Sequence, residues 1–318
     1  MKRVFISRAL PEKVLDAARV RFDVTVRDGT DPMGLDEAVA ALEGFDAVLP
    51  TLGDAYGAAA FAEPGRIRAR ILANFGVGYN HIDVSAAQRA GIHVTNTPGA
   101  VTDATADIAM TLILMTARRA GEGERLVRRG AWEGWHPTQL LGLHLGGKTV
   151  GIVGMGRIGK AIAKRAVAGF GMEAVYLNRS PVAEPGVPAQ ALATVAEVAG
   201  AADILVAAVP ATPETRHLFD AEVFAAMKPT GILINIARGD VMDEAALIAA
   251  LETGQIAGAG LDVYEFEPKV PAALRAMENV TLLPHLGTAA LEVREAMGLM
   301  AVENLIAWEE GRDLPNAV

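Results

Sequence analysis

A glycine-rich turn in the middle of the chain has the residue types and spacing to bind a phosphorylated ligand. In TVGIVGMGRIGKAIA, residues 149–163, Gly154, Gly156 and Gly159 follow an apolar run and precede a helical pattern. The first glycine permits a tight turn, the second lets a pyrophosphate approach the backbone, and the third allows close helix packing. Glycine spacing of this kind is also a common structural device, but its position between a strand and a helix predicts a dinucleotide site.

The next strand-like run, VYLNRSP at residues 175–181, lacks the acidic residue that usually follows such a turn. In this kind of fold an Asp or Glu about 20 residues after the glycines binds the adenosine ribose. Here the chain has Asn178, Arg179 and Ser180. Arg179 can pair with a ribose 2′-phosphate, and Asn178 and Ser180 can donate to it. We therefore expect NADP(H) to be preferred, with NAD(H) as the alternative if Arg179 is only a solvated or adenine-stacking residue.

Three further stretches carry groups that bind anions and transfer protons: NIARGD with Arg238, LDVYEFEP with Asp262 and Glu267, and LLPHLG with His285. Each follows a strand-like run, so each is expected at the carboxyl end of a strand, where open α/β sheets form their sites. Taken singly, each has an ordinary explanation as a solvated arginine, a loop carboxylate or a structural histidine. Their shared position makes them candidate catalytic residues.

The elements that must position these residues alternate between strand and helix. From Lys148 onward, apolar runs are separated by turns and Ala-rich helical patterns, which favours a parallel sheet covered by helices. The first hundred residues repeat this alternation more weakly, with RVFISRAL, FDVTV, FDAVLP and RARILANFG as strand candidates. The predicted fold class is α/β, with two Rossmann-like doubly wound domains.

Two long helical patterns connect or follow these domains. One runs from about Thr102 or Asp103 to residue 130, and its apolar part is too short for a membrane but suits a buried linking helix. The other covers residues 289–311, after the last strand of the second domain, and can return to pack on the first.

Length and composition exclude several classes of protein. A chain of 318 residues is expected to form two domains. With 29 Lys and Arg against 38 Asp and Glu, the net charge of -9 disfavours nucleic acid as a partner. The N-terminus lacks the pattern of a signal peptide, no run is apolar enough to span a membrane, and there is no Cys, which together predict a cytoplasmic protein. His81, His93 and His217 show no metal-ligand pattern, so no metal is expected.

Taken together, the motifs resemble one known family. FGVGYNHID, TNTPG, TDATADIAM, GIVGMGRIGKAIA, NIARGD, GLDVYEFEP and LLPHLG are similar to motifs of the D-isomer-specific 2-hydroxyacid dehydrogenases, in the same order over nearly the whole chain. The stretch GAWEGWHPTQLLGLHL is most similar to the glyoxylate/hydroxypyruvate reductase branch. The resemblance implies a dinucleotide-binding domain at 99–285 and a substrate-binding domain at 1–98 plus 286–318. It also implies an active site in an interdomain cleft, whose closure would exclude water.

The resemblance also implies catalytic roles for individual residues. His285 matches the general acid/base, and Glu267 matches the carboxylate that fixes the tautomer of this histidine. Arg238 matches the guanidinium that holds the substrate carboxylate, and the backbone amides of Val77 and Gly78 match the loop that receives its other end. The implied reaction is NAD(P)H-dependent reduction of a small 2-oxo acid, glyoxylate or hydroxypyruvate, to the D-2-hydroxy acid, with a hydride from nicotinamide and a proton from His285.

Further residues are assigned to the cofactor and to the substrate pocket by the same resemblance. The expected cofactor-binding residues are Gly154, Met155, Gly156, Arg157, Ile158, Gly159, Asn178, Arg179, Ser180, Val209, Pro210, Thr215, Ile236, Ala237, Arg238, Asp262, His285 and Gly287, with Asp262 at the carboxamide. The loops around Leu52, Gly53 and Trp135 are expected to line the pocket. Trp132 and Trp135 lie in the segment that joins subunits in related homodimers. The resemblance implies that a Trp there can reach the partner's active site, and the alternative is that both tryptophans only anchor the interface.

The sequence is also compatible with two other functions, and it argues against a third. Glu267 argues against formate dehydrogenase activity, because those relatives have Gln at this position. A reductase of bulkier 2-oxo acids such as phenylpyruvate is one alternative, since the sequence does not place the pocket loops. A dinucleotide-sensing binding protein similar to the C-terminal-binding corepressors is another, although the short termini disfavour it.

Overall fold

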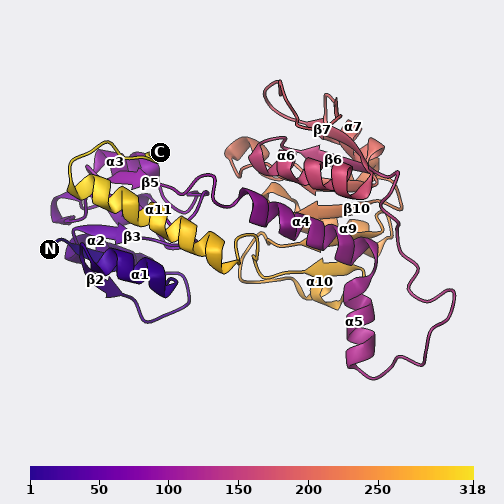
Figure 1. Cartoon of the computed structure of the whole chain (residues 1–318), viewed down its shortest axis with the longest axis horizontal. Coiled ribbons are helices and arrows are strands. Elements are labelled where there is room, and N and C mark those ends of the chain that lie inside the picture. The colour runs from indigo at the N-terminus through magenta and orange to yellow at the C-terminus, as the bar shows by residue number, and fades with distance from the viewer. The chain divides into compact units, whose positions relative to one another are not determined.

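Two parallel sheets organise the chain, one in each of two structural units (Figure 1). The computed structural model describes residues 1–318, apart from the side chain of Pro64. The first unit consists of Met1–Val101 and Ala289–Val318, and the second of Thr102–Thr288. These divisions fall shortly after the expected ones at residues 98 and 285.

The first unit contains a five-stranded sheet in the order β2-β1-β3-β4-β5, with all neighbours parallel. Strands β3 and β4 are buried along their whole length, as expected for a parallel sheet with elements on both faces. The chain turns from one side of β1 to the other, so the loops after β1 and β3 are neighbours at the carboxyl edge. The strands are β1 (Arg3–Ile6), β2 (Asp23–Val26), β3 (Ala47–Leu49), β4 (Ile71–Ala73) and β5 (His93–Thr95).

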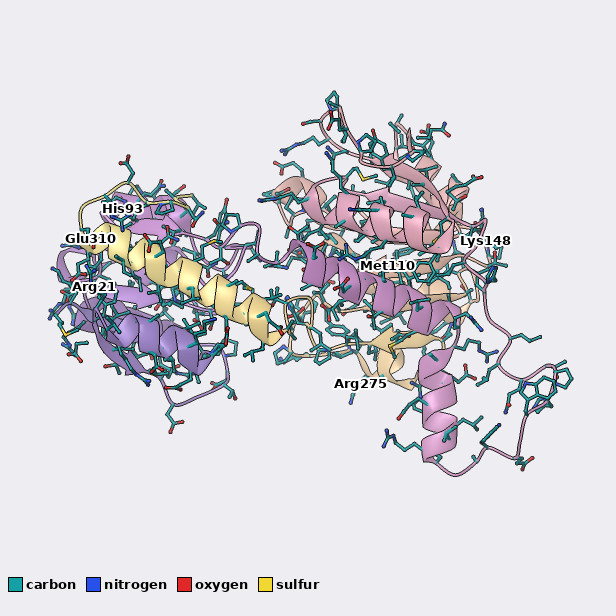
Figure 2. All side chains as sticks on the ribbon, viewed as in Figure 1. Arg21, His93, Met110, Lys148, Arg275 and Glu310 are labelled. Carbon is teal, nitrogen blue, oxygen red and sulfur yellow. The ribbon has the colours of Figure 1, made fainter. Side chains whose placement is uncertain are left out.

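The C-terminal helix belongs to the first unit, where it packs on the first helix. Gly298 allows this close approach, because a Cβ there would lie 2.6 Å from the side chain of Val14. An ion pair of 2.8 Å between Arg21 and Glu310 holds the end of the helix to the turn before β2 (Figure 2). The helices of this unit are α1 (Glu12–Arg19), α2 (Leu35–Gly44), α3 (Val84–Arg89) and α11 (Leu291–Glu309).

The second unit contains a seven-stranded parallel sheet in the order β12-β11-β10-β9-β6-β7-β8. The chain moves outward from β6 to β7 and β8, and then crosses to β9 on the other side of β6. In such sheets ligands bind outside the carboxyl ends of the strands at this switch point. The strands are β6 (Thr149–Val153), β7 (Glu173–Leu177), β8 (Gln190–Ala191), β9 (Ile204–Ala207), β10 (Ile232–Asn235), β11 (Gly258–Leu261) and β12 (Val280–Leu282).

Helices cover this sheet on both faces and close two apolar cores. The buried side of α4, including Leu112 and Ile113, packs with α6 on one core, while Phe224 of α8 and Leu247 of α9 lie in the other. The helices are α4 (Thr102–Ala117), α5 (Ala120–Arg128), α6 (Arg157–Lys164), α7 (Val195–Ala201), α8 (Ala221–Ala226), α9 (Glu244–Glu252) and α10 (Ala272–Ala276).

The helical pattern expected from Thr102 to residue 130 is two helices, not one. The break lies at Arg119, which has a left-handed φ of 52°. The carbonyl of Ala117 accepts a 2.7 Å hydrogen bond from the amide of Leu143, so it is not available to the next turn of the helix. The segment that returns after α5 therefore ends α4, and α5 projects from the second unit (Figure 1).

The two doubly wound sheets confirm the predicted α/β fold class. The short elements that were not predicted include β5, β8, α3, α7 and α10. For α7 the sequence did contain a signal, the N-cap residue Thr194, whose hydroxyl accepts from the amide of Glu197; the Glu197 carboxylate accepts in turn from the amide of Ala193, the residue before the N-cap. Within the described residues, no helix is both long and apolar enough to cross a membrane.

Candidate active site

Arg238 follows β10 and is held in a half-buried position at the carboxyl edge of the sheet. Its backbone carbonyl accepts a 3.1 Å hydrogen bond from the side chain of Asn235, the last residue of the strand. Its guanidinium donates one bond to the carbonyl of Ala237, 2.8 Å away. Burial lowers the pKa of Arg238, an effect that the charges of Glu267 and Asp240 oppose. The guanidinium keeps further N–H groups with which it can bind an anion.

Glu267 and His285 form the only direct contact between two of the predicted catalytic side chains in the described chain. His285 Nδ1 lies 2.9 Å from Glu267 Oε2. Burial raises the pKa of Glu267, but the hydrogen bond and charge of His285, the amide of Tyr264 and the charge of Arg238 together outweigh it, so that the pKa is lowered overall. An ionised carboxylate only accepts hydrogen bonds, so Nδ1 must donate. The Nε2 atom is then the one that can exchange a proton with a ligand.

Asp262 holds the turn that carries His285. Its carboxylate accepts bonds from the amides of Leu286 at 2.6 Å and Gly287 at 2.8 Å, and its carbonyl accepts from the amide of His285 at 2.9 Å. The side chain is 1% exposed, and this burial raises the pKa of Asp262, with partial compensation from the two amides and from His285. The expected role of Asp262 at the carboxamide stays a prediction, while its role in the turn is one that sequence reasoning missed.

Tyr264 is a second residue that the sequence analysis missed. Its amide donates to Glu267 Oε1 at 3.1 Å and its hydroxyl donates to the carbonyl of Leu283 at 2.9 Å, which ties the two loops that carry Glu267 and His285. Gly239 lies directly against it, because a Cβ there would fall 1.8 Å from the Tyr264 carbonyl carbon. The three loops after β10, β11 and β12 are therefore packed together.

The glycine turn after β6 fits a dinucleotide pyrophosphate. Gly154 has a φ of 103° and Gly159 lies so close to Gly154 that a Cβ would come within 2.1 Å of its carbonyl oxygen. A Cβ at Gly156, by contrast, would meet nothing within 4 Å. The outer glycines are thus required by packing within the chain, while the middle one leaves an open approach to the N-terminus of α6. This is where an anion would bind.

The residues after β7 present an exposed guanidinium. Asn178 donates from its side chain to the carbonyl of Ser180 at 2.8 Å, which closes the turn. Arg179 is exposed and forms no ion pair in the described part of the chain. Hydrogen bonds from Thr212 and from its own amide lower the pKa of Glu214, and the charge of Arg179 lowers it further. Glu214 is therefore near Arg179, although 35 residues separate the two in the sequence.

The remaining cofactor candidates lie at the same edge of the sheet. Thr215 follows β9 and uses its hydroxyl within the turn, where it accepts from the amide of Thr212 at 2.8 Å and donates to the carbonyl of Pro210 at 2.7 Å. Gly287 is held by Asp262 and its carbonyl accepts from the hydroxyl of Thr105 at 3.2 Å. The other candidates at this edge include Met155, Arg157, Ile158, Val209, Ile236 and Ala237.

Four of the predicted substrate contacts lie in the first unit and one in the α5–β6 segment of the second. Val77 and Gly78 follow β4, and Leu52 and Gly53 follow β3, so both pairs are at the carboxyl edge of the first sheet. Gly53 has a left-handed φ of 87°. Trp135 is 81% exposed. Apart from Trp135, the candidates of each unit thus lie at the carboxyl edge of its own sheet.

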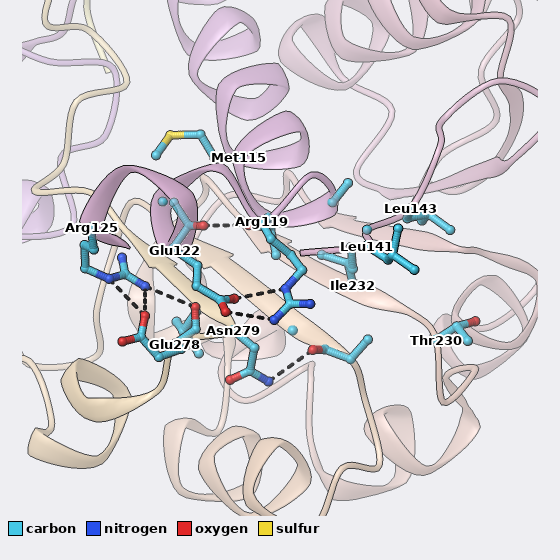
Figure 3. A pocket seen from close by; sticks show the side chains of 18 of the residues that line it. Met115, Arg119, Glu122, Arg125, Leu141, Leu143, Thr230, Ile232, Glu278 and Asn279 are labelled. Atoms are coloured by element: carbon cyan, nitrogen blue, oxygen red, sulfur yellow. Dashed lines mark hydrogen bonds and ion pairs between the residues drawn. The ribbon is translucent and has the colours of Figure 1, made fainter. Parts of the chain in front are cut away.

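A cavity of about 670 Å³ lies elsewhere in the second unit (Figure 3). It is lined by the ends of α4 and α5, by the segment around Leu141 and by residues next to β12. Arg119 pairs with Glu122, and Arg125 pairs with Glu278, at its wall. None of Arg238, Glu267 and His285 lines it, so we do not assign the chemistry to this cavity.

The doubly wound sheets, the glycine turn at the switch point of the second and the histidine–carboxylate pair beside a half-buried arginine define a class of protein. It is the class of two-unit α/β proteins that bind a nicotinamide dinucleotide.

Comparison with known proteins identifies the family. The model of the D-isomer specific 2-hydroxyacid dehydrogenase NAD-binding domain matches residues 110–287. A glyoxylate reductase from Pyrococcus furiosus is 44% identical, over 99% of this chain and 95% of the relative. The chain belongs to the D-isomer specific 2-hydroxyacid dehydrogenase family, which confirms the predicted resemblance.

Solved structures agree with this assignment. The TT0316 protein from Thermus thermophilus is 43% identical, with a TM-score of 0.92 over 99% of each chain. The NADPH-dependent glyoxylate/hydroxypyruvate reductase from Sinorhizobium meliloti, solved with NADP and malonate, is 38% identical. Its TM-score is 0.87, covering 100% of this chain and 96% of that one.

Proposed function

We propose that the protein reduces a small 2-oxo acid, glyoxylate or hydroxypyruvate, to the D-2-hydroxy acid with a nicotinamide dinucleotide as hydride donor. The observation that carries the proposal is the 2.9 Å contact between His285 Nδ1 and Glu267 beside Arg238. Reduction of a carbonyl needs a proton donor, and reduction of an acid needs a cation for its carboxylate. The relatives named as glyoxylate reductases support the substrate class.

Each residue has a role in this proposal. The dinucleotide supplies a hydride for the carbonyl carbon. His285 gives a proton from Nε2 to the carbonyl oxygen, while Glu267 holds Nδ1 and stabilises the ring. Arg238 binds the substrate carboxylate and polarises the carbonyl. The backbone amides of Val77 and Gly78, in the first unit, are further groups that bind a carboxylate.

We further propose that NADPH is the preferred form of the cofactor. Arg179 is exposed, unpaired within the described chain and at the end of β7, where a 2′-phosphate would lie. Glu214 is an acidic group near Arg179 and opposes this preference. The Sinorhizobium meliloti relative is NADPH-dependent, which supports the same choice.

The protein is also proposed to be a homodimer that associates through α5 and the segment after it. No residue of α5 is buried, and Val127, Trp132, Trp135 and Leu141 are all exposed in this part of the chain. A group of large exposed apolar side chains is typical of a protein interface.

A matrix of initial rates tests the function. NADPH and NADH are each combined with glyoxylate, hydroxypyruvate, pyruvate and phenylpyruvate. We expect the highest kcat/KM with NADPH and one of the first two acids. The largest value with phenylpyruvate would instead favour a reductase of bulky acids, and negligible turnover of all four would favour a binding protein.

The same assay tests the proton donor. His285→Ala is expected to lower kcat by about 10²- to 10⁴-fold, the usual contribution of a general acid, with little change in melting temperature. His93→Ala is the control, because His93 is an exposed histidine in the first unit. Equal kcat values for wild type and His285→Ala would contradict the assignment.

A further inference from the structure

Two asparagines to which the resemblance assigns no role hold the loop that follows β4: Asn74 at the end of RARILANFG and Asn96 in TNTPG. The side-chain amide of Asn74 donates to the carbonyls of Gly76 and Gly78, each at 3.1 Å. The side-chain amide of Asn96 donates to the carbonyl of Val77 at 2.9 Å. Three successive backbone carbonyls are therefore bonded to side chains at the ends of β4 and β5.

These bonds determine where the amides of the loop point. In a trans peptide the C=O and the following N–H have opposite directions. The Gly76 carbonyl shares its peptide plane with the Val77 amide, and the Val77 carbonyl shares its plane with the Gly78 amide. Neither amide donates to a backbone carbonyl in the described chain. With the carbonyls bonded toward the strand ends, the amides face away from them and are free for a ligand.

We propose that Asn74 and Asn96 are positioning residues that aim the amides of Val77 and Gly78 at the substrate carboxylate. The Gly78 carbonyl shares its peptide plane with the Tyr79 amide, so the bond from Asn74 also orients this third amide. We call the backbone amides of Val77, Gly78 and Tyr79 the anion cradle. The inference rests on the proposed function, because it names the groups that set the geometry of its carboxylate site. A row of amides with fixed direction binds an anion without the cost of ordering the loop.

The chemistry of Asn74 shows why an amide is needed there. The side chain is fully buried, and its Oδ1 atom has no hydrogen-bond partner among the described residues. The side chain is therefore held only through its NH₂ group, which donates to two carbonyls. A carboxylate of the same shape would place an anionic oxygen against two carbonyl oxygens and would turn the peptide planes.

The experiment compares Asn96→Asp and Asn74→Asp with Gln88→Glu. Gln88 is an exposed side chain of the same unit whose amide donates to an oxygen of Val318 at 3.2 Å, so this control makes the same amide-to-carboxylate change elsewhere. The readouts are KM and kcat for glyoxylate, KM for NADPH, the Kd of oxamate measured calorimetrically with saturating NADPH, and the melting temperature.

We expect the oxamate Kd and the glyoxylate KM to rise on the order of 10- to 100-fold in both Asn variants, since small misplacement of binding groups has effects of this size. The KM for NADPH should stay within about twofold, and Gln88→Glu should resemble the wild type. If Asn74→Asp does not fold, the half-buried Asn96 carries the test.

The results separate this inference from the proposed function. An unchanged oxamate Kd in folded Asn96→Asp, or no oxamate binding by the wild type, would contradict the proposal that the two asparagines orient these amides toward the substrate carboxylate. A wild type that binds oxamate but turns over none of the 2-oxo acids overturns the function and leaves the cradle to be decided by the variants.

Discussion

His285 is held by two acidic residues, by Glu267 at its ring and by Asp262 at the backbone of its turn. Glu267 contacts Nδ1, while Asp262 accepts from the amides of the two residues that follow His285. This double restraint matters because His285 has a left-handed φ of 57°, which is unfavourable for a residue with a side chain. The structure therefore uses the aspartate to maintain a strained turn and the glutamate to orient the ring.

The lowered pKa of Glu267 predicts a specific dependence of stability on pH. A carboxyl group whose pKa is lower in the folded than in the unfolded chain stabilises the fold above its unfolded pKa, and this contribution is lost as the pH falls through the folded value. The difference in melting temperature between wild type and Glu267→Gln should therefore be largest near neutral pH and should decrease below about pH 4.

The comparison with Glu267→Gln is needed because the pKa values of other carboxyl groups are shifted in the opposite direction. Asp262 and Glu244 have raised pKa values, chiefly through burial, so they bind protons more readily in the folded chain. Melting curves at a series of pH values would give the difference directly. A gap between the two proteins that stays constant into the acid range would show that Glu267 is not stabilised as an anion.

Arg179 allows a test of cofactor choice at a single residue. Arg179→Ala is expected to lower kcat/KM for NADPH by about ten- to a hundredfold, the value of a lost hydrogen bond to a charged group, and to leave NADH nearly unchanged. Arg275→Ala, at an exposed arginine of α10 in the same unit, is the control. Equal losses with both cofactors would mean that Arg179 does not contact the 2′-phosphate.

At the scale of elements, different glycines of the turn between β6 and α6 serve packing and ligand binding. Gly159 touches the backbone of Gly154, whereas Gly156 has open space on its Cβ side. The three glycines of one motif are therefore retained for two different reasons, close packing of strand against helix and access for a ligand.

This difference predicts different results for two alanine variants. Gly159→Ala should cost about 1–3 kcal/mol or more through overpacking and should weaken NADPH binding as the turn is displaced. Gly156→Ala should keep the melting temperature within a few degrees while it raises the Kd for NADPH, because its methyl group occupies the approach of the pyrophosphate. Fluorescence titration with NADPH and thermal unfolding of both variants would check this, and an unchanged Kd in Gly156→Ala would argue against a phosphate site.

At the scale of the whole molecule, the proposed homodimer predicts that one charge on α5 should separate the subunits. Val127 is 60% exposed on a helix without a buried residue, so Val127→Glu should fold normally but place a desolvated charge in the interface. Val20→Glu is the matched control, at a valine that is 76% exposed in the first unit. Sedimentation equilibrium should give a dimer for the wild type and the control. A monomeric wild type would refute the proposal.

Local patterns account for what could be predicted before the structure. The strands β6, β7, β9 and β10 are recognised because apolar runs precede turns at regular intervals, and the glycine turn because its three glycines are within six residues of one another. The residues Arg238, Glu267 and His285 each follow a strand, so a parallel sheet brings them to one edge. The sheet order is not needed for any of these predictions.

The sequence by itself determined the α/β class, the dinucleotide turn and the family, because these depend on patterns within short windows and on the order of motifs. Only the tertiary structure decided which distant groups meet. The amide of Leu143 donates to the carbonyl of Ala117 where α4 ends, and the side chain of Asn96, at the end of the neighbouring strand, donates to the carbonyl of Val77. Such contacts join residues that are far apart in the chain, and strand order and loop course, which have no local signature, bring them together.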